Sequence, residues 1–389
     1  MKTKLILFII LLSVIGCTSI EKKGAQSNDG AIVIDVNSAL KSEGRNFEDM
    51  IESVELIPLE TTEASVIGTI IKSIVTDKYI YIVDFYEGST GLLQFEKNGK
   101  FVKRYIKGGG ADEFNYILAI SFSDNCLYVF DTQKLLKYSE SGKFIGAKPY
   151  SDQNLASIAK DGDGFVTLQV AEQTEDHKFK IIKLDSNLVK KSELSLDPIS
   201  SISNTGEICS DGNNGLIYRL FDNNIYGWSD NGFNVKYRLD FSDYEYQIQF
   251  EKYQNLPPEQ RYQAFTMLMA DIEKGRYVFF GSVHNSDDYL SFLLMSNESS
   301  APIFFNKNTG KTSIKKYGDN KSPLAQFSES GTVRGKKNTF FGSIIPEYIG
   351  DCWKYNPNNL FSAKDIEILK NAKEDDNPII VIYKLKDNL

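Results

Sequence analysis

Few side chains in this sequence could hold a metal ion or act as a catalytic base. The 389 residues include two histidines, His177 and His284, and neither has another histidine or a cysteine close to it in the sequence. A zinc site needs several converging histidine, cysteine or carboxylate ligands. A serine triad needs a histidine beside its nucleophile, and the sequence lacks the G-x-S-x-G pattern of many hydrolases. We therefore predict no metal, no cofactor and no serine triad.

Carboxylates are the remaining candidates for catalysis. A glycosidase needs two acids on either side of the bond that it cleaves, and these acids can be far apart in the sequence. The adjacent Asp287 and Asp288 fit a solvated loop better. Asp161 and Asp163 resemble part of a calcium-binding loop, but a full site needs six or more oxygen ligands, so a tight turn explains them. No catalytic residue is assigned, and a pair of acids brought together by the fold stays open.

A glycine-rich stretch, KGGGADEF at residues 107–114, could suggest a phosphate-binding loop. It lacks the Gly-Lys-Ser/Thr ending of such loops, and no helical pattern follows it directly. We interpret it as a turn between two structural units, in which Glu113 bonds to backbone groups.

Aromatic residues in two insertions are the best candidates for ligand contact. Residues 243–274 contain a Pro-Pro pair followed by an amphipathic pattern that predicts a helix. Residues 345–377 contain a second predicted helix, which Ser362 would cap, after a loop with aromatic residues. Either insertion could instead be structural cover for the core. The candidate contact residues are Tyr244, Tyr246, Tyr253, Tyr262, Trp353 and Tyr355, whose rings have both apolar and polar surface.

The insertions interrupt a repeat that organises most of the chain. Residues 69–106 contain four short apolar runs, and an Asn-Gly pair precedes the last of them. Asn-Gly between alternating runs is a strong hairpin signal, because both residues tolerate positive φ. The same four-strand pattern recurs at residues 117–148, 155–196, 206–241 and 276–318.

A period of about 40 to 60 residues with four strands per unit is typical of the blades of a β-propeller. A single twisted sheet cannot bury both of its faces, so blades stack around an axis. We predict an all-β protein, in which residues 31–389 form one six-bladed β-propeller. Its blades would be four-stranded and antiparallel, with short helical insertions.

The ring must also close, which predicts a role for both ends of the chain. Residues 31–36 have no partner in the first blade, and we expect them to pair with the C-terminal strand in blade six. Such pairing removes a free sheet edge. We also expect the apolar runs YVFFGSV and TFFGSII to be the innermost strands of blades five and six, which would make the axial funnel apolar.

Several stretches carry a resemblance to a known family. They are IESVELIPLETTEASVIGTIIKSI at residues 51–74, YIYIVDF, FEKNGKFV, KGGGADEF and the ending NPIIVIYKLK. Together they resemble the six-bladed β-propeller lipoproteins of Bacteroidota, which are similar in shape to NHL-repeat propellers. In that family a glycine-rich stretch ending in Gly-Glu-Tyr follows blade one; here Glu113 and Phe114 match it, whereas Ala111 and Asp112 depart from it. The resemblance implies the fold and an envelope location, but no particular activity.

The N-terminus has the layout of a lipoprotein export signal. Lys2 and Lys4 precede an apolar run at residues 5–15, which as a helix would span roughly 17 Å of a hydrocarbon layer about 30 Å thick. The run ends in Val-Ile-Gly-Cys, and a small residue before Cys17 resembles the lipobox, in which the cysteine is acylated. We predict a signal peptide at residues 1–17 with a lipid on Cys17, and a polar tether at residues 18–30. An ordinary signal peptide with an incidental cysteine is the alternative.

The net charge excludes some classes of binding partner, and the remaining cysteines indicate whether disulfides are expected. The formal net charge is −8, so we expect neither nucleic acid nor anionic lipid head groups as partners. Cys126, Cys209 and Cys352 are widely spaced and odd in number, so we expect buried thiols and no disulfide framework, although one pair could form.

These observations predict an exported protein, anchored by lipid to the bacterial envelope at the outer membrane. It would bind a glycan, a peptide or a partner protein on one propeller face without catalysis. The alternative is a carbohydrate- or peptide-active enzyme with carboxylate, tyrosine and arginine groups in the axial funnel. Two carboxylates about 5 to 10 Å apart in the funnel would favour the enzyme.

Overall fold

Short apolar strands separated by turn residues build every blade. In the first blade, strands β5 (Tyr79–Tyr86) and β6 (Ser89–Glu96) are buried along most of their length, whereas the outer strand β7 (Phe101–Arg104) is only partly covered. The middle strands are buried because a neighbouring blade packs on each face of the sheet. Gly99 in the β6–β7 turn has a φ of 90°, and a Cβ there would collide with the carbonyl oxygen of Pro58, so the turn requires glycine.

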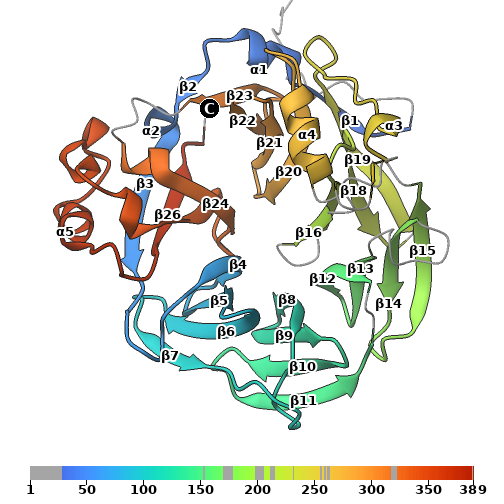
Figure 1. Cartoon of the computed structure of the whole chain (residues 1–389), viewed down its shortest axis with the longest axis vertical. Helices are drawn as coiled ribbons and strands as arrows, with labels where there is room; N and C mark the ends of the chain where they lie inside the picture. The colour runs from blue at the N-terminus through green and yellow to red at the C-terminus, as the bar shows by residue number, and fades with distance from the viewer. Residues whose placement is uncertain are drawn as a thin grey trace, which may run out of the picture.

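The computed structural model describes residues 29–151, 154–169, 178–197, 206–210, 215–230, 232–254, 256–257, 260, 263–316, 322–387 and 389. Their strands form six sheets around a central axis (Figure 1). The predicted six-bladed propeller of antiparallel, four-stranded blades is therefore confirmed. The predicted signal peptide with Cys17, and also Tyr262 and His177, lie outside the described residues.

Blades one to three are continuous in the sequence, and their first strands lie nearest the axis (Figure 1). Blade one contains β4 (Thr69–Val75) followed by β5, β6 and β7. Blade two contains β8 (Ile117–Ser123), β9 (Cys126–Asp131), β10 (Lys134–Ser139) and β11 (Phe144–Pro149). Blade three contains β12 (Leu155–Asp161), β13 (Gly164–Gln169), β14 (Phe179–Leu184) and β15 (Lys190–Leu196).

Blades four and five each gain a short strand from the N-terminal segment. Blade four contains β16 (Gly206–Ser210), β17 (Gly215–Arg219), β18 (Asn224–Ser229) and β19 (Gly232–Asp240). Blade five contains β20 (Val278–Asn285), β21 (Tyr289–Met295), β22 (Ser300–Asn306) and β23 (Thr312–Lys316). Strand β1 (Ile32–Asp35) pairs in parallel with β19, and β2 (Arg45–Asn46) pairs in parallel with β23.

Blade six joins the two ends of the chain, but with a different N-terminal strand from the one predicted. It contains β24 (Phe327–Thr332), β25 (Thr339–Ile344), β26 (Ile379–Leu385) and β3 (Ile51–Pro58). Strand β3 pairs antiparallel with β26, with Leu56 opposite Val381. The prediction that residues 31–36 close the ring was wrong, because their apolar side chains pack on blade four, where Ile34 is fully buried opposite Leu239.

The expectation for the innermost strand of blade six was also wrong. TFFGSII forms β25, the second strand, and β24 occupies the axial position with the sequence FSESGT. Strand β25 is almost wholly buried between its neighbours, which explains its apolar sequence. The innermost strand of this blade is therefore polar.

The core lies between adjacent blades. One cluster joins Ile57 of β3 and Phe341 of β25 to Ile80 and Leu93 of blade one, so it seals the contact between the last and the first blade. Fully burying an apolar side chain of this size contributes about 1.5–3 kcal/mol. Asn377 adds polar bonds at the same place, since its side-chain nitrogen donates to the carbonyl oxygens of Glu60 and Ser65, both at 2.8 Å.

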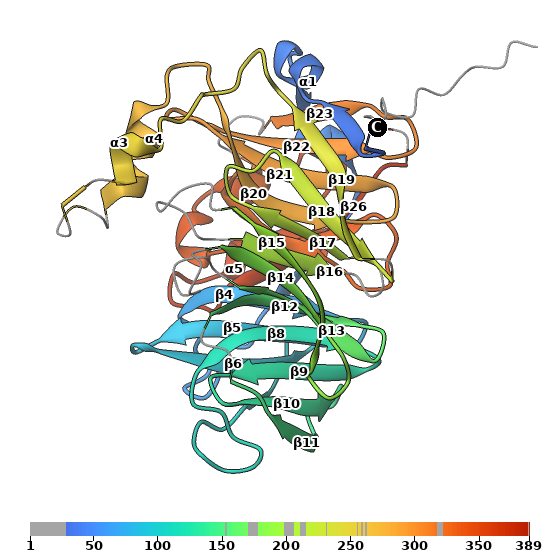
Figure 2. The same cartoon turned by 90° about the vertical axis from the view of Figure 1, so that its right-hand side faces the viewer.

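Short helices lie outside the blades. Helices α1 (Asn37–Lys41) and α2 (Phe47–Met50) flank β2, and α3 (Glu251–Gln254) and α4 (Ala264–Asp271) belong to the first insertion. Helix α4 is shorter than the predicted pattern, and α3 and α4 project from one face of the ring (Figure 2). Helix α5 (Ala363–Asn371) has the predicted Ser362 cap, whose hydroxyl accepts a bond from the Asp365 backbone N–H at 3.2 Å. None of the helices in the described ranges is long and apolar enough to cross a membrane.

The pairing of β3 with β26 makes a direct prediction. Replacing Ser53 and Lys384, which are register partners, by cysteine should allow a disulfide between the two strands. That disulfide should add about 2–4 kcal/mol to the free energy of unfolding. Peptide mapping by mass spectrometry under non-reducing conditions, together with urea unfolding, would check it. The control pair Asp35→Cys and Lys384→Cys should not crosslink, and efficient crosslinking of that pair instead would contradict the observed closure.

Candidate functional site

The six innermost strands surround an axial channel that contains two cavities. The entry cavity, of about 370 Å³, lies where these strands begin and is lined by residues such as Ile71, Leu118 and Phe280. The inner cavity, of about 110 Å³, lies towards their ends and is lined by residues such as Ser121 and Arg334. The residues that line both cavities are Lys72, Ile120 and Glu207.

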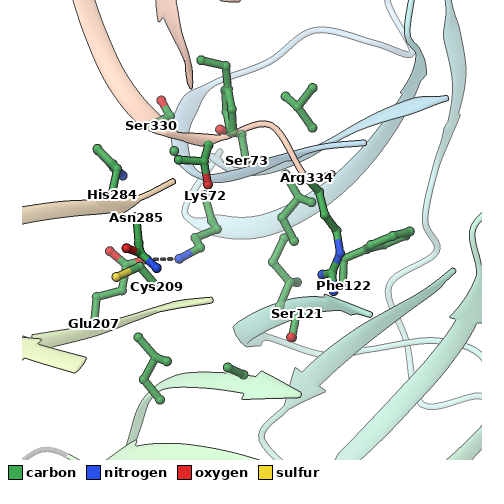
Figure 3. Close-up of a pocket in the computed structure, with 18 of the residues that line it drawn as sticks. Lys72, Ser73, Ser121, Phe122, Glu207, Cys209, His284, Asn285, Ser330 and Arg334 are labelled. Atoms are coloured by element: carbon green, nitrogen blue, oxygen red, sulfur yellow. Dashed lines mark ion pairs between the residues drawn. The ribbon is translucent and has the colours of Figure 1, made fainter. Parts of the chain in front are cut away.

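An ion pair crosses the channel between the two cavities. Lys72 comes from β4 of blade one and Glu207 from β16 of blade four, on opposite sides of the ring (Figure 1). The Lys72 amine contacts Glu207 Oε1, as Figure 3 shows. The Tyr218 hydroxyl donates to the other carboxylate oxygen, Glu207 Oε2, at 3.1 Å. Both oxygens of Glu207 are therefore held, and the three side chains form a polar bar across the axis.

Burial in the channel shifts the pKa values of the Lys72 amine and the Tyr218 hydroxyl. Burial lowers the pKa of the Lys72 amine to about 8, although about a third of its side chain (34%) still contacts water in the channel. Burial raises the pKa of the Tyr218 hydroxyl, so it stays a hydrogen-bond donor at neutral pH. The Glu207 carboxylate favours the charged form of Lys72, because a negative neighbour stabilises an ammonium group.

The inner cavity contains further polar groups. Arg334, just after β24, places its guanidinium 5.6 Å from the centre of the Phe122 ring and donates to Ser123 Oγ at 3.4 Å. His284 of β20 lies across the cavity from Arg334 (Figure 3), and its Nε2 atom is buried without a hydrogen-bond partner. Burial lowers the pKa of His284; the charges of Lys72 and Lys315 act in the same direction, and Glu329 opposes them.

A second charged cluster interacts electrostatically with His284 through Lys315 and Glu329. The amine of Lys315 lies 3.3 Å from Glu329 Oε1 and 3.6 Å from the centre of the Phe47 ring. The Tyr383 hydroxyl donates to the same Glu329 oxygen at 2.5 Å. Burial opposes ionisation of Glu329, but Lys315, His284 and Tyr383 together hold the pKa of this carboxyl below its ordinary value. Because Lys315 belongs to blade five and Glu329 to blade six, the cluster also joins these blades.

Exposed apolar side chains gather at the end of the channel where the entry cavity opens. Strand β4 begins beside the end of β5, so the β5–β6 turn lies on this face. The loop from blade one to blade two lies on the same face, since the backbone N–H of Ile117 donates to Thr90 at the start of β6. The exposed residues on this face are Ile71, Phe85, Tyr86, Ile106 and Tyr116.

Helix α4 extends this face on the side of blade five. The Phe265 ring of α4 lies 5.8 Å from the ring of Phe280, which lines the entry cavity. The chain then continues from α4 through Tyr277 into the start of β20. The first insertion is therefore a wall beside the mouth of the channel. We refer to this surface, from the β5–β6 turn to α4, as the α4 face.

The tyrosines proposed from the sequence support this wall. Tyr253 is 2% exposed, packs on Leu268 and donates to Asp271 at 2.5 Å. Tyr246 packs on the same small cluster, and the Tyr244 carbonyl oxygen accepts a bond from the Tyr277 N–H at 2.8 Å.

The aromatic residues of the second insertion, Trp353 and Tyr355, are not part of the α4 face. Trp353 is half-buried against the core of blade six, with the amines of Lys354 and Lys370 at 5.3 and 5.6 Å from its ring centre. Trp353 packs on a cluster that includes Leu369 of α5, and α5 lies at the outer edge of the ring, away from the axis (Figure 1). Tyr355, two residues further along the chain, is half-buried. The structure therefore does not bring the two aromatic groups together.

Three cysteines lie in the part of the chain that the structure describes. No disulfide joins any two of Cys126, Cys209 and Cys352. All three are half-buried, so the expectation of fully buried thiols was wrong. Cys209 lines the inner cavity, and burial raises the pKa of the Cys352 thiol to about 11. Within the described ranges, no three histidine, cysteine or carboxylate side chains are close enough to hold a metal ion.

Sequence reasoning missed the channel residues. Lys72 and Glu207 each lie inside the short first strand of a blade, in TIIKSIV and GEICS. A charged residue within such a strand is the signal that could have identified them, because first strands face the axis. Arg334 follows β24, a strand that we did not predict from the sequence.

The low pKa of Lys72 can be measured. The rate at which acetic anhydride labels this amine should rise with a midpoint near pH 8. Lys41 is a suitable control, because its contact with Asp243 raises its pKa. Mass spectrometry of tryptic peptides would follow both residues. In Glu207→Gln the Lys72 midpoint should fall further, because the ammonium loses its counter-ion. A Lys72 midpoint equal to that of Lys41 would rule out the proposed environment.

This chain is similar to solved structures from two Bacteroides species. A presumed exported protein from Bacteroides fragilis has a TM-score of 0.70 at 17% identity, over 92% of this chain and 99% of that chain. A member of the DUF4221 family from Bacteroides vulgatus has a TM-score of 0.49 at 11% identity, over 86% of this chain and 97% of that chain. At these identities the likeness concerns the fold alone.

A search of curated proteins found no match. The Bacteroides fragilis structure agrees with the propeller fold that the resemblance implied, while the NHL relationship stays a prediction. The family model described as Domain of unknown function (DUF4934) matches residues 31–384, which include every strand except the last residue of β26, and the chain therefore belongs to the DUF4934 family.

Proposed function

We propose that the protein is an exported, non-catalytic binding propeller, and that its ligand enters the axial channel from the α4 face. The observation that carries the proposal is the group of exposed apolar and aromatic side chains around the entry cavity. Ile71 is 54% exposed and Ile106 is 62% exposed, and a soluble protein rarely gathers such residues on one face without a partner.

The floor and the rim of this site offer different contacts. The rim supplies rings such as Tyr86 and Tyr116, which can stack on a sugar or on apolar side chains. The floor supplies the Lys72–Glu207 pair with Tyr218, which can bind hydroxyl, amide or charged groups. A cavity of about 370 Å³ lies within the size range of ligand sites. A glycan, a peptide or a segment of a partner protein fits this combination.

The site differs from the apolar funnel expected from the sequence, because charged groups form its floor. The features that favour binding are therefore the exposed aromatic and apolar residues of the rim and the Lys72–Glu207 ion pair of the floor. Each charge of the bar already has an opposite charge or a hydrogen-bond partner, which suits a preformed binding surface.

An enzyme is the second candidate, and one observation favours it. A lysine whose pKa is about 8 is close to the range of a general base, and Lys72 lies beside a tyrosine and a carboxylate. A glycosidase, however, needs two carboxylates. Among the described residues that line the two cavities, Glu207 is the one carboxylate. Its ion pair with Lys72 makes it poorly suited to accept a proton.

Export and lipid anchoring belong to the same proposal. The N-terminal segment with Cys17 has the layout of a lipoprotein signal, and a structural relative is a presumed exported protein. We propose that a lipid on Cys17 holds the propeller at the bacterial envelope, in the outer membrane.

A ligand panel tests the binding proposal. Thermal unfolding of the full chain in a mild detergent would be followed with glycans, peptidoglycan fragments and short peptides. A ligand at a hundred times its Kd adds about 2.7 kcal/mol of stability, which raises Tm by a few degrees. The shift should disappear in Ile71→Ser, at the mouth of the entry cavity. It should persist in Val189→Ser, a similarly exposed residue in the β14–β15 turn.

Two outcomes would count against this site. A shift that survives in Ile71→Ser but is lost in Val189→Ser would move binding to another face. Turnover of any panel member by the wild-type protein, lost in Lys72→Met, would favour the enzyme.

The anchoring proposal has a separate test. Cys17→Ser should move the protein from the membrane fraction to the soluble fraction, because the lipid can no longer be attached. Immunoblots of fractionated cells would measure the distribution, with the neighbouring Ser19→Ala as the control. Unchanged membrane association of Cys17→Ser would refute a lipid on this residue.

A further inference from the structure

The outer edges of the blades are covered in different ways. Strands β1 and β2 each add a parallel strand to the edges of blades four and five. In blade six the buried Asp365 of α5 accepts a bond from the Leu56 N–H of β3 at 3.0 Å. In blade one Glu60 accepts a bond from the Phe101 N–H of β7 at 2.7 Å. Native proteins cover their sheet edges in such ways because an open edge pairs readily with another chain.

Blades two and three end in edges that no strand covers in the described part of the chain. In blade three β15 has the sequence KKSELSL, and charged side chains protect a sheet edge. In blade two β11 has the sequence FIGAKP, in which only Lys148 and Pro149, at the end, are protective. This strand lies at the outer rim of the ring (Figure 1), and its Ile145 is 53% exposed. Blade two therefore has the least protected of the described edges.

The backbone of β11 presents bonding groups along this edge. The N–H of Tyr150, just after the strand, donates to the carbonyl oxygen of Gln133 at 3.0 Å. In an antiparallel pair the bonded residues alternate, so the backbone groups of Ile145 and Ala147 point away from β10. Within the described residues no hydrogen bond reaches these groups. They can therefore pair with another extended segment.

A groove beside β11 has room for a large side chain. A cavity of about 450 Å³ lies between this strand and blade three, and its lining includes Tyr128, Gly146 and Phe165. Gly146 is the register partner of Lys137, which is the partner of Tyr128, so these three residues share one face of the sheet. A Cβ on Gly146 would meet nothing within 4 Å. An aromatic side chain on an added strand can cover a glycine in such a position.

The charge beside this edge is positive. Lys143 and Lys148 are exposed, and no carboxylate among the described residues forms an ion pair with either of them. The acids that line the groove, Asp124 and Asp163, interact with the amine of Lys160. The edge itself therefore favours an acidic segment, although the protein as a whole has a net charge of −8.

We propose that β11 binds an extended segment of a partner protein, which adds an outer strand to blade two. The segment runs parallel to β11, as β1 and β2 do beside their blades. It places an aromatic side chain over Gly146 and acidic side chains at the neighbouring positions on the same face, within reach of Lys143 and Lys148. Main-chain bonds give affinity in this mode of recognition, and alternate side chains give specificity. The site lies on the outer rim and does not depend on the function proposed for the channel.

A peptide with this pattern tests the proposal. The full chain in detergent would be titrated into fluorescein-labelled Thr-Asp-Val-Phe-Val-Asp-Thr, and fluorescence anisotropy would measure Kd. Replacing Phe by Ala, or both Asp by Lys, should weaken binding about tenfold or more. Hydrogen exchange followed by mass spectrometry should slow in β11 on binding, because the N–H groups of Ile145 and Ala147 become bonded.

Variants of β11 distinguish this edge from the rest of the protein. Gly146→Val has room for its side chain, so it should fold but weaken peptide binding about tenfold or more by filling the groove. Ala147→Pro should also weaken binding, because it removes an N–H that points outwards. Gly109→Val is the matched control, since a Cβ there also meets nothing within 4 Å. Ile71→Ser is the control for the channel, and both controls should bind the peptide like the wild type.

Two results would overturn the proposal. The first is the absence of peptide binding, or equal affinity in wild type and a Gly146→Val variant whose circular dichroism shows that it is folded. The second is a dimer of the wild-type chain, detected by light scattering, that Gly146→Val dissociates. In that case a second copy of the chain, and not a partner segment, occupies the edge.

Discussion

Closure of the ring is the constraint on which the rest of this structure depends. A blade exposes both faces of its sheet until neighbours cover them, and the last blade has no neighbour unless it meets the first. Strand β3 solves this problem by completing blade six beside β26, and the apolar contact between blades six and one then seals the ring. Asn377 fixes the chain that leaves β3 through bonds to Glu60 and Ser65. Without this closure the innermost strands would not surround an axis, and no channel would exist.

The same constraint explains why charged residues occupy the centre. The inner strands converge on the axis, where cavities remain between the blades and charged side chains can contact water. Lys72 and Glu207 reach across this space from opposite blades and neutralise each other, with Tyr218 as a third partner. An isolated charge in such a position would be costly, whereas a paired one is tolerated. The pair therefore links opposite sides of the ring and divides the channel at the same time.

The two ends of the channel are consequently unlike each other. The α4 face combines exposed apolar residues with a polar floor, which suits a ligand that has rings or apolar side chains as well as polar groups. The inner cavity is smaller, and serine, asparagine, histidine and arginine side chains form part of its lining. Both properties arise in one propeller because each inner strand contributes different side chains at its beginning and at its end.

The sequence by itself determined the fold class, because strand periodicity and turn residues are local signals. The recurrence of four strands per unit and the Ser362 cap were readable for the same reason. The strand that closes the ring could not be predicted from the sequence, since residues 31–36 and 51–58 are both short apolar runs. Only their packing, against blade four or in blade six, distinguishes them. The site also required the tertiary structure. Lys72, Glu207 and Arg334 are far apart in the sequence, and they become neighbours only because the ring brings the strands of different blades to one axis.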